Sequence, residues 1–239
     1  MSKRKLKEYR YDEIYGGKGY ERKSGFLEWL SSNLKSYDQT RYQTVFKSLE
    51  KGQRLLDIGC GNGYFCLMAK QLFDDVYGVD VSKVRIMDAE KAIFNRQDHE
   101  NFHFVQYDTD ERLPFSDDFF DAISCIATLE FLLYPKQAVM EMRRVLRPNG
   151  IVVVQVGNIA FLPDRLALLT GRLPTLAGID EIGVDWDRLH SFTKEVLVKL
   201  FRNGGFEIIN LSCSGIFANQ RRAWLSLLAG DIIVKARKT

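Results

Sequence analysis

The sequence has few cysteines and histidines and no long apolar run. Its four cysteines are Cys60, Cys66, Cys125 and Cys213. No two of them form a close pair, and with only three histidines the chain shows no regular metal-ligand spacing. These absences exclude a disulfide-stapled scaffold and predict a reduced, cytoplasmic protein without a bound metal. Polar residues such as Gln155 and Asn158 interrupt the most apolar stretch, so no membrane-spanning helix is predicted.

Neither sign of charge dominates. The 34 basic and 31 acidic residues leave a net charge of +3, which is too small to indicate nucleic acid or an anionic membrane as a partner. Hydrophobic residues make up 46% of the chain, which excludes a disordered protein. A length of 239 residues suits one domain. No feature of the sequence indicates an oligomeric state.

Short apolar runs alternate with helical periodicity from about residue 50 onward. This alternation is typical of a parallel α/β sheet. The predicted strands cover residues 54–58, 76–79, 102–107, 120–127, 151–156, 206–211 and 231–236. Ser82 and Thr193 are expected to cap helices, and another helix is expected to begin near Pro135. Two further helices, roughly 25–36 and 39–49, are predicted ahead of the first strand.

A glycine-rich loop, Asp57-Ile58-Gly59-Cys60-Gly61-Asn62-Gly63, stands between the first strand and the next helix. Glycines at this place let the chain turn tightly and bring backbone N–H groups against a ligand. The spacing is not the G-x-G-x-x-G of dinucleotide-binding loops, because Tyr64 follows Gly61 at the third position. The Gly-Lys-Ser/Thr of a phosphate loop is also missing. A nicotinamide dehydrogenase and a P-loop enzyme are therefore disfavoured.

Asp80 lies 23 residues after Asp57, at the end of the second predicted strand. A carboxylate at this place can accept both hydrogen bonds from a ribose diol. By itself Asp80 could equally be a helix cap or a solvated side chain. Together with the glycine loop it predicts a nucleoside-containing ligand.

On these residues the chain resembles the class I S-adenosylmethionine-dependent methyltransferases that act on small molecules. The motifs that carry the resemblance are residues 55–63, 79–82, 108, 113–115, 119–123, 129–130, 144–150, 190–193 and 205–206. The resemblance implies an α/β fold: a Rossmann-like, mostly parallel sheet of seven strands in the order 3-2-1-4-5-7-6. Strand 7 is expected to run antiparallel, and helices are expected on both faces.

The resemblance also implies which residues bind the cofactor, S-adenosylmethionine, and its product, S-adenosylhomocysteine. Asp57 is expected near the amino group of the cofactor, Asp80 at the ribose hydroxyls, and Asp108 with Thr109 at the adenine edge. The full set of expected cofactor contacts is Asp57, Gly59, Cys60, Gly61, Gly63, Asp80, Val81, Asp108, Thr109 and Ala127. Carboxylates suit the ammonium, diol and exocyclic amine of this ligand.

Methyl transfer from a sulfonium is an in-line displacement that needs positioning and a dry site more than a dedicated base. The weak candidates for a base are His190 and Glu130, although His190 could be a hinge residue and Glu130 could cap a loop. Many relatives have histidine after Leu-Glu, and Phe131 at this place indicates a less polar acceptor pocket. The candidate acceptor contacts are Tyr15, Tyr20, Phe131, Asn158 and Arg165. The acidic residues Asp180, Glu181, Asp185 and Asp187 are expected to form an exposed turn rather than a metal site.

The predicted domain has four parts. Residues 1–50 form a helical cover, 51–156 the cofactor-binding core, 157–192 a lid insertion, and 193–239 the last helix and strands. The insertion resembles the lid of the methionine-biosynthesis protein W group. The predicted function is methyl transfer to a small-molecule acceptor, and the open alternative is a partner or regulatory protein that binds S-adenosylmethionine with little turnover.

Overall fold

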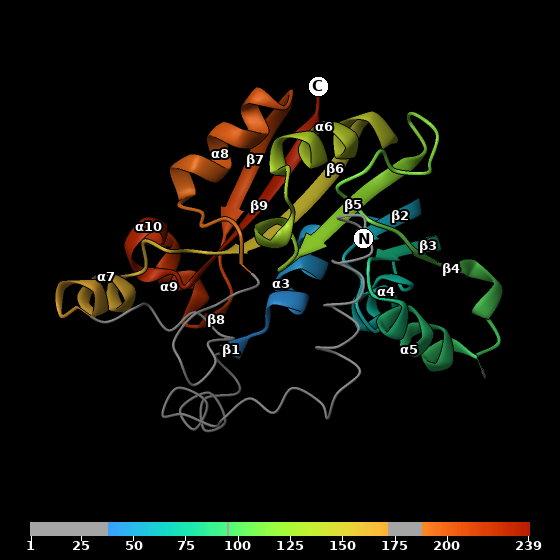
Figure 1. The fold of residues 1–239 in the computed structure, drawn as a ribbon, viewed down its shortest axis with the longest axis horizontal. Helices are drawn as coiled ribbons and strands as arrows, with labels where there is room; N and C mark the ends of the chain where they lie inside the picture. Colours follow the sequence, from blue (N-terminus) through green and yellow to red (C-terminus); the bar gives the residue numbers. More distant parts are fainter. Residues whose placement is uncertain (1–37, 95, 172–187) are drawn as a thin grey trace, which may run out of the picture.

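The computed structural model describes residues 38–94, 96–171 and 188–239. A mixed seven-stranded sheet, β4-β3-β2-β5-β6-β9-β7, forms its centre (Figure 1). Numbered along the chain, these strands have the order 3-2-1-4-5-7-6, which confirms the prediction. β9 runs antiparallel to β6 and β7, and the other neighbouring strands are parallel.

The seven strands match the predicted runs. They are β2 (Gly52–Ile58), β3 (Phe73–Asp80), β4 (Phe102–Gln106), β5 (Phe120–Ile126), β6 (Leu146–Gly157), β7 (Phe206–Ser212) and β9 (Asp231–Lys238). β6 begins earlier than predicted because Leu146 pairs with Phe120 ahead of a register shift, and Asn149 takes up the irregularity with a φ of 63°. A small antiparallel pair, β1 (Asp38–Gln39) and β8 (Gly215–Ile216), was not predicted.

The helices follow the strands in the expected alternation. They are α3 (Arg41–Ser48), α4 (Tyr64–Ala69), α5 (Lys83–Ile93), α6 (Pro135–Val145), α7 (Leu162–Leu169), α8 (Lys194–Asn203), α9 (Ala218–Arg221) and α10 (Leu225–Leu228). Three 3-10 turns are η1 (His99–Asn101), η2 (Leu129–Phe131) and η3 (Arg222–Trp224). The hydroxyls of Ser82 and Thr193 each accept a backbone N–H at 3.3 Å, so both predicted caps are confirmed.

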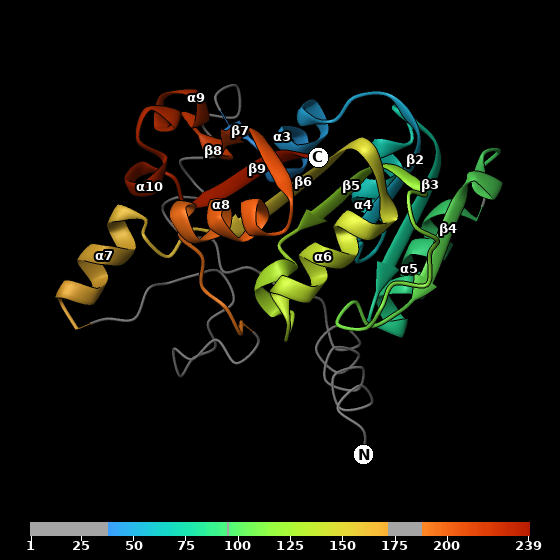
Figure 2. The same ribbon diagram turned by 90° about the horizontal axis from the view of Figure 1, so that it is seen from above.

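Helices cover both faces of the sheet. α6 and α8 lie on one face, and α3, α4 and α5 lie on the other (Figures 1 and 2). Successive strand residues alternate between the two cores: Val152 and Val154 pack under α6 and α8, whereas Val153 packs towards α3. A strand that is covered on both faces needs apolar side chains on both, which explains the apolar run 151–154 in β6.

One arginine fastens the loop between β4 and β5 to α6. The guanidinium of Arg144 donates to the carbonyls of Leu113 and Phe115 at 2.9 and 2.8 Å. It also pairs with the carboxylates of Asp117 and Glu141, each at 2.7 Å. This planar group satisfies four partners at once, so it orders a loop that begins at the carboxyl edge of the sheet.

We predict that Arg144→Lys lowers the free energy of unfolding by about 2 kcal/mol. The ammonium group of lysine cannot form all the hydrogen bonds that the planar guanidinium makes with its five N–H donors. Urea unfolding measures the loss. Lys136→Ala, a change at an exposed position of the same helix, is the control and should stay close to wild type. Equal stability of the two variants would show that the loop does not depend on Arg144.

Candidate functional site

The glycine loop turns from β2 into α4 through three residues with left-handed backbone. The φ angles are 74° at Gly59, 54° at Gly61 and 74° at Gly63, which only glycine adopts without strain. A Cβ at Gly59 would lie 2.0 Å from Oγ1 of Thr128, whereas a Cβ at Gly61 would meet nothing within 4 Å. The loop is therefore packed against the end of β5 at Gly59 and faces open space at Gly61.

Asp80 ties this loop to the end of β3. Its Oδ2 accepts the N–H of Gly61 at 2.9 Å, and its Oδ1 accepts the N–H of Ser82 at 2.9 Å. The carbonyl of Val79 accepts two further N–H groups of the loop, from Gly59 at 2.8 Å and Cys60 at 3.1 Å. Asp80 therefore fixes the loop through both of its carboxylate oxygens.

Asp57 lies beneath the loop with only 2% of its surface exposed. Its carboxylate accepts the hydroxyl of Ser124 at 2.7 Å and the thiol of Cys66 at 3.6 Å. Burial raises the pKa of Asp57 to about 7, although the hydrogen bonds from Ser124 and Cys66 oppose the shift. Ser124 is not among the residues predicted from the sequence. The available signal was a polar residue within the apolar run of β5, where it stands directly across from Asp57 in the paired strands.

The other expected cofactor contacts follow the neighbouring strands. Asp108 and Thr109 come after β4 and are both buried, and Oδ1 of Asp108 accepts the N–H of Asp110 at 3.1 Å. Val81 follows β3, and its carbonyl accepts the side-chain amide of Gln106 at 3.2 Å. Ala127 follows β5 with a φ of 51°.

The carboxyl ends of parallel neighbouring strands lie at one edge of a sheet. The structure therefore brings together at this edge Gly59, Gly61, Asp80, Val81, Asp108, Thr109 and Ala127. Cys60 and Gly63 belong to the same loop but are buried in it.

Glu130 joins the two ends of the insertion after β6. Its Oε1 accepts the N–H of Gly157 at 3.4 Å and lies 3.5 Å from Nη1 of Arg188. Its backbone carbonyl accepts the N–H groups of Leu189 and His190 at 2.9 and 3.0 Å. Burial raises the pKa of Glu130, and the positive charge of Arg188 opposes the shift. Oε1 of Glu130 therefore caps the loop, whereas its Oε2 has no hydrogen-bond partner among the described residues, and a role of Glu130 towards the acceptor stays a prediction. His190 is attached to Glu130 through its backbone.

Two of the predicted acceptor contacts, Asn158 and Arg165, make hydrogen bonds within the fold. Asn158 is fully buried: its Nδ2 donates to the carbonyl of Ala229 at 2.8 Å, and its Oδ1 accepts the N–H of Ala160 at 3.1 Å. Arg165 donates from Nε to the carbonyl of Ala160 at 2.6 Å. The amide of Asn158 is therefore used within the fold, whereas a contact of Asn158 or Arg165 with an acceptor stays a prediction. Phe131 has the guanidinium of Arg188 5.9 Å from its ring centroid.

Several predicted features lie outside the described residues. They are the helix 25–36, Tyr15, Tyr20 and the acidic residues Asp180, Glu181, Asp185 and Asp187. Within the described ranges, no group of three histidine, cysteine, aspartate or glutamate side chains could hold a metal ion. No helix in the same part of the chain is long and apolar enough to cross a membrane.

A sequence profile of the methyltransferase domain matches residues 56–154. The chain is 35% identical over 97 residues to the uncharacterized methyltransferase YcgJ of Bacillus subtilis, covering 41% of this chain and 38% of that protein. It is 30% identical over 175 residues to the O-methyltransferase cnsE of Penicillium expansum, covering 72% and 59%. It is 28% identical over 173 residues to the ubiquinone/menaquinone biosynthesis C-methyltransferase UbiE of Coxiella burnetii, covering 66% and 68%.

Solved structures share the fold along most of the chain. The [4+2]-cyclase SpnF superimposes with a TM-score of 0.65 at 22% identity, covering 99% of this chain and 97% of that one. The YcgJ protein of Bacillus subtilis gives a TM-score of 0.58 at 17% identity, covering 82% and 96%. The chain spans 38% and 59% of the length of the first two curated relatives, less than two thirds of either.

We predict that Gly59→Ala costs about 2–4 kcal/mol of stability, because the new methyl group overlaps Thr128 and the backbone is left-handed. The matched change Gly61→Ala should cost only about 1 kcal/mol, since it adds the backbone strain without the overlap. Urea unfolding of both variants measures the difference. Equal losses would show that the contact between Gly59 and Thr128 does not constrain the loop.

A second prediction concerns pH. The pKa of Asp57 rises from 3.8 to about 7 on folding, so the folded state binds the proton more tightly than the unfolded state. This group therefore stabilises the protein fully below about pH 4, and the contribution falls as the pH rises towards 7, by up to about 4 kcal/mol. Asp57→Asn keeps an oxygen for the hydroxyl of Ser124 but cannot ionise.

The free energy of unfolding of wild type relative to Asp57→Asn should thus decrease between pH 4 and pH 7. Chemical denaturation at a series of pH values gives both curves. Parallel curves would show that Asp57 does not titrate in this range.

Proposed function

Because this chain belongs to the class I S-adenosylmethionine-dependent methyltransferases, we propose that it transfers a methyl group from S-adenosylmethionine to a small-molecule acceptor. One observation carries the proposal: Asp80 accepts the N–H of Gly61, so a carboxylate and an open glycine turn stand side by side at the carboxyl edge. Residues 51–156 form the cofactor-binding part in this proposal.

The residues at this edge fit the cofactor. A Cβ at Gly61 would meet no protein atom within 4 Å, so the backbone there is open to a close ligand. Asp80 is a carboxylate at a strand end of the kind that accepts ribose hydroxyls, and Asp108 with Thr109 is suited to the adenine side. Asp57 lies beneath the loop as a buried carboxylate for the ammonium group, whose positive charge would favour its ionised form.

When bound, S-adenosylmethionine supplies an activated methyl group on a sulfonium. The chain holds the donor and the acceptor in line and keeps water out, which accounts for most of the catalysis such a displacement needs. Only Oε1 of Glu130 is engaged, by Gly157 and Arg188, while its Oε2 is buried without a hydrogen-bond partner among the described residues, so Glu130 stays a weak candidate for a base beside His190. The proposal therefore favours an acceptor atom that is soft or has a low pKa, and Phe131 supports a less polar pocket.

The relatives differ in the atom that they methylate, so they do not identify the acceptor atom of this chain. The names of cnsE and UbiE specify O- and C-methylation, respectively. SpnF is described as a cyclase although it shares the fold, so the fold alone does not establish methyl transfer. The proposal therefore keeps to a small-molecule acceptor. The other candidate is a binding protein with little turnover, which the test below separates.

Isothermal titration tests the cofactor half of the proposal. We expect S-adenosylhomocysteine to bind in the micromolar range and NAD not to bind. Asp80→Ala should weaken the binding of S-adenosylhomocysteine by about 30- to 1000-fold, because two charge-assisted hydrogen bonds are worth about 2–4 kcal/mol. Asp88→Ala, which removes a partly exposed carboxylate from the next helix, is the matched control and should bind as wild type does.

Unchanged affinity of Asp80→Ala would remove this residue from the site, and tight NAD binding would overturn the cofactor assignment. Turnover is measured with methyl-labelled S-adenosylmethionine against panels of phenols, thiols, amines and carboxylic acids. If wild type transfers the labelled methyl group and Asp80→Ala does not, the result supports an enzyme. Tight binding without transfer to any panel favours the binding protein.

A further inference from the structure

Two connections at the carboxyl edge form one projecting lobe. We call residues 158–171, with α7, and residues 213–230, with α9, η3 and α10, the edge lobe. The two segments are joined by hydrogen bonds from Asn158 to the carbonyl of Ala229 at 2.8 Å and from Arg165 to that of Ser226 at 3.5 Å. Figures 1 and 2 both place α7, α9 and α10 together at one end of the molecule.

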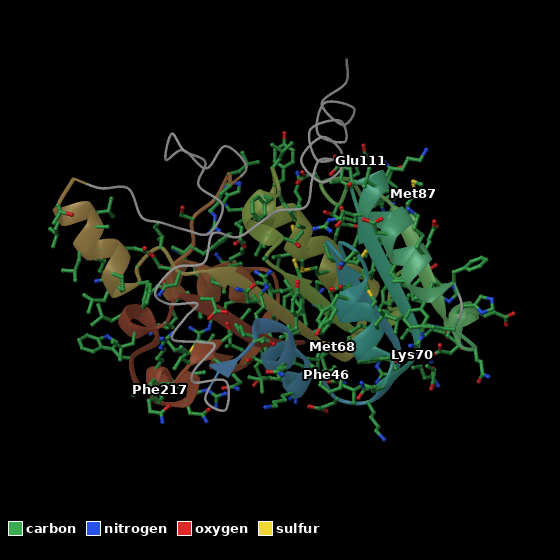
Figure 3. All side chains as sticks on the ribbon, turned by 90° about the horizontal axis from the view of Figure 1, so that it is seen from below. Phe46, Met68, Lys70, Met87, Glu111 and Phe217 are labelled. Atoms are coloured by element: carbon green, nitrogen blue, oxygen red, sulfur yellow. The ribbon has the colours of Figure 1, made fainter. Side chains whose placement is uncertain are left out.

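The edge lobe exposes an unusual amount of apolar surface. Its large exposed side chains are Leu162, Leu166, Leu168, Leu169, Phe217, Trp224 and Leu228. Leu169 is 83% exposed and Trp224 is 58% exposed. Figure 3 shows Phe217 at the margin of the molecule, far from Met87 on α5. Exposed apolar residues that stand singly are ordinary, but a group on neighbouring elements marks a surface that is covered in use.

The same surface is basic and has no exposed acid. Within residues 158–171 and 213–230, Asp164 is the one carboxylate, and it is buried. Arg165 and Arg222 are exposed, and Arg221 is partly exposed. No described acidic side chain lies within ion-pair distance of these three arginines. The lobe therefore combines leucine, tryptophan and arginine, whereas the net charge of the whole chain is only +3.

We propose that the edge lobe docks on an anionic phospholipid surface. Leucine and phenylalanine side chains enter the boundary of the acyl chains, tryptophan lies at the level of the head groups, and arginines pair with lipid phosphates. A second copy of the chain fits this surface less well, because it would bring the same arginines into contact. The positive charges of Arg165, Arg221 and Arg222 favour binding to an anionic surface over binding to a neutral one.

The edge lobe lies at the same edge of the sheet as the candidate cofactor site. α7 follows the carboxyl end of β6, and α9 follows the carboxyl end of β7, so both connections leave the edge that carries Asp80 and the glycine loop. Docking through the lobe therefore brings this edge to the lipid surface. The docking itself does not depend on methyl transfer and can be measured without a methyl donor.

Vesicle co-sedimentation tests the proposal with the full chain. Wild type should sediment with phosphatidylcholine vesicles that contain phosphatidylglycerol, and far less with pure phosphatidylcholine. Leu169→Ser combined with Trp224→Ser should weaken partitioning by about tenfold or more, since two large side chains no longer enter the lipid. Arg222→Glu should weaken it by about 30-fold on anionic vesicles only, at about 1 kcal/mol for each unit of charge.

Phe94→Ser is the matched control, because Phe94 is 78% exposed but ends α5, outside the lobe, and this variant should sediment like wild type. Thermal unfolding shows that each variant is folded. The proposal is overturned if wild type binds neither kind of vesicle, or if the Leu169 and Trp224 variant binds as wild type does. It is also overturned if sedimentation velocity shows lipid-free self-association that this variant abolishes, because a second copy would then cover the lobe.

Discussion

The close approach of the backbone at Gly59 to the side chain of Thr128 is the constraint on which the site depends. No side chain fits at Gly59, and its φ of 74° turns the chain as it leaves β2. Two residues later the loop reaches Asp80, whose carboxylate accepts the N–H of Gly61. A glycine loop fixed at both points has its open backbone in place before any ligand arrives, so binding does not have to order it.

The strands could be predicted because their signals are local, whereas their order in the sheet was implied by the resemblance to the methyltransferases. Each strand is a short apolar run, the caps at Ser82 and Thr193 are single residues, and the glycine spacing identifies the loop that precedes α4. The α9–η3–α10 connection and the β1–β8 pair could not be predicted. Their residues form no extended periodic pattern, and β1 meets β8 across more than half of the chain.

Polar residues inside apolar segments were the hardest to interpret. Ser124 and Asn158 look alike in the sequence, but Ser124 lies across from Asp57 in a neighbouring strand, whereas Asn158 closes the edge lobe through the carbonyl of Ala229. Both are buried and hydrogen-bonded, as buried polar groups must be. Only the register and the long-range partner separate a residue beneath the site from one that holds a surface lobe, and neither can be read from spacing along the chain.

Residues 127–130 contact both the glycine loop and the insertion after β6. Thr128 packs against Gly59, and two residues later Glu130 accepts N–H groups from Gly157 and from residues 189 and 190, where the insertion begins and ends. The segment is short and irregular, with Ala127 in left-handed backbone, so it cannot shift at one end without straining the other. The glycine loop and the insertion that carries α7 are therefore attached to the same four residues. A change at the base of the insertion reaches the loop through packed atoms, without any movement of the sheet.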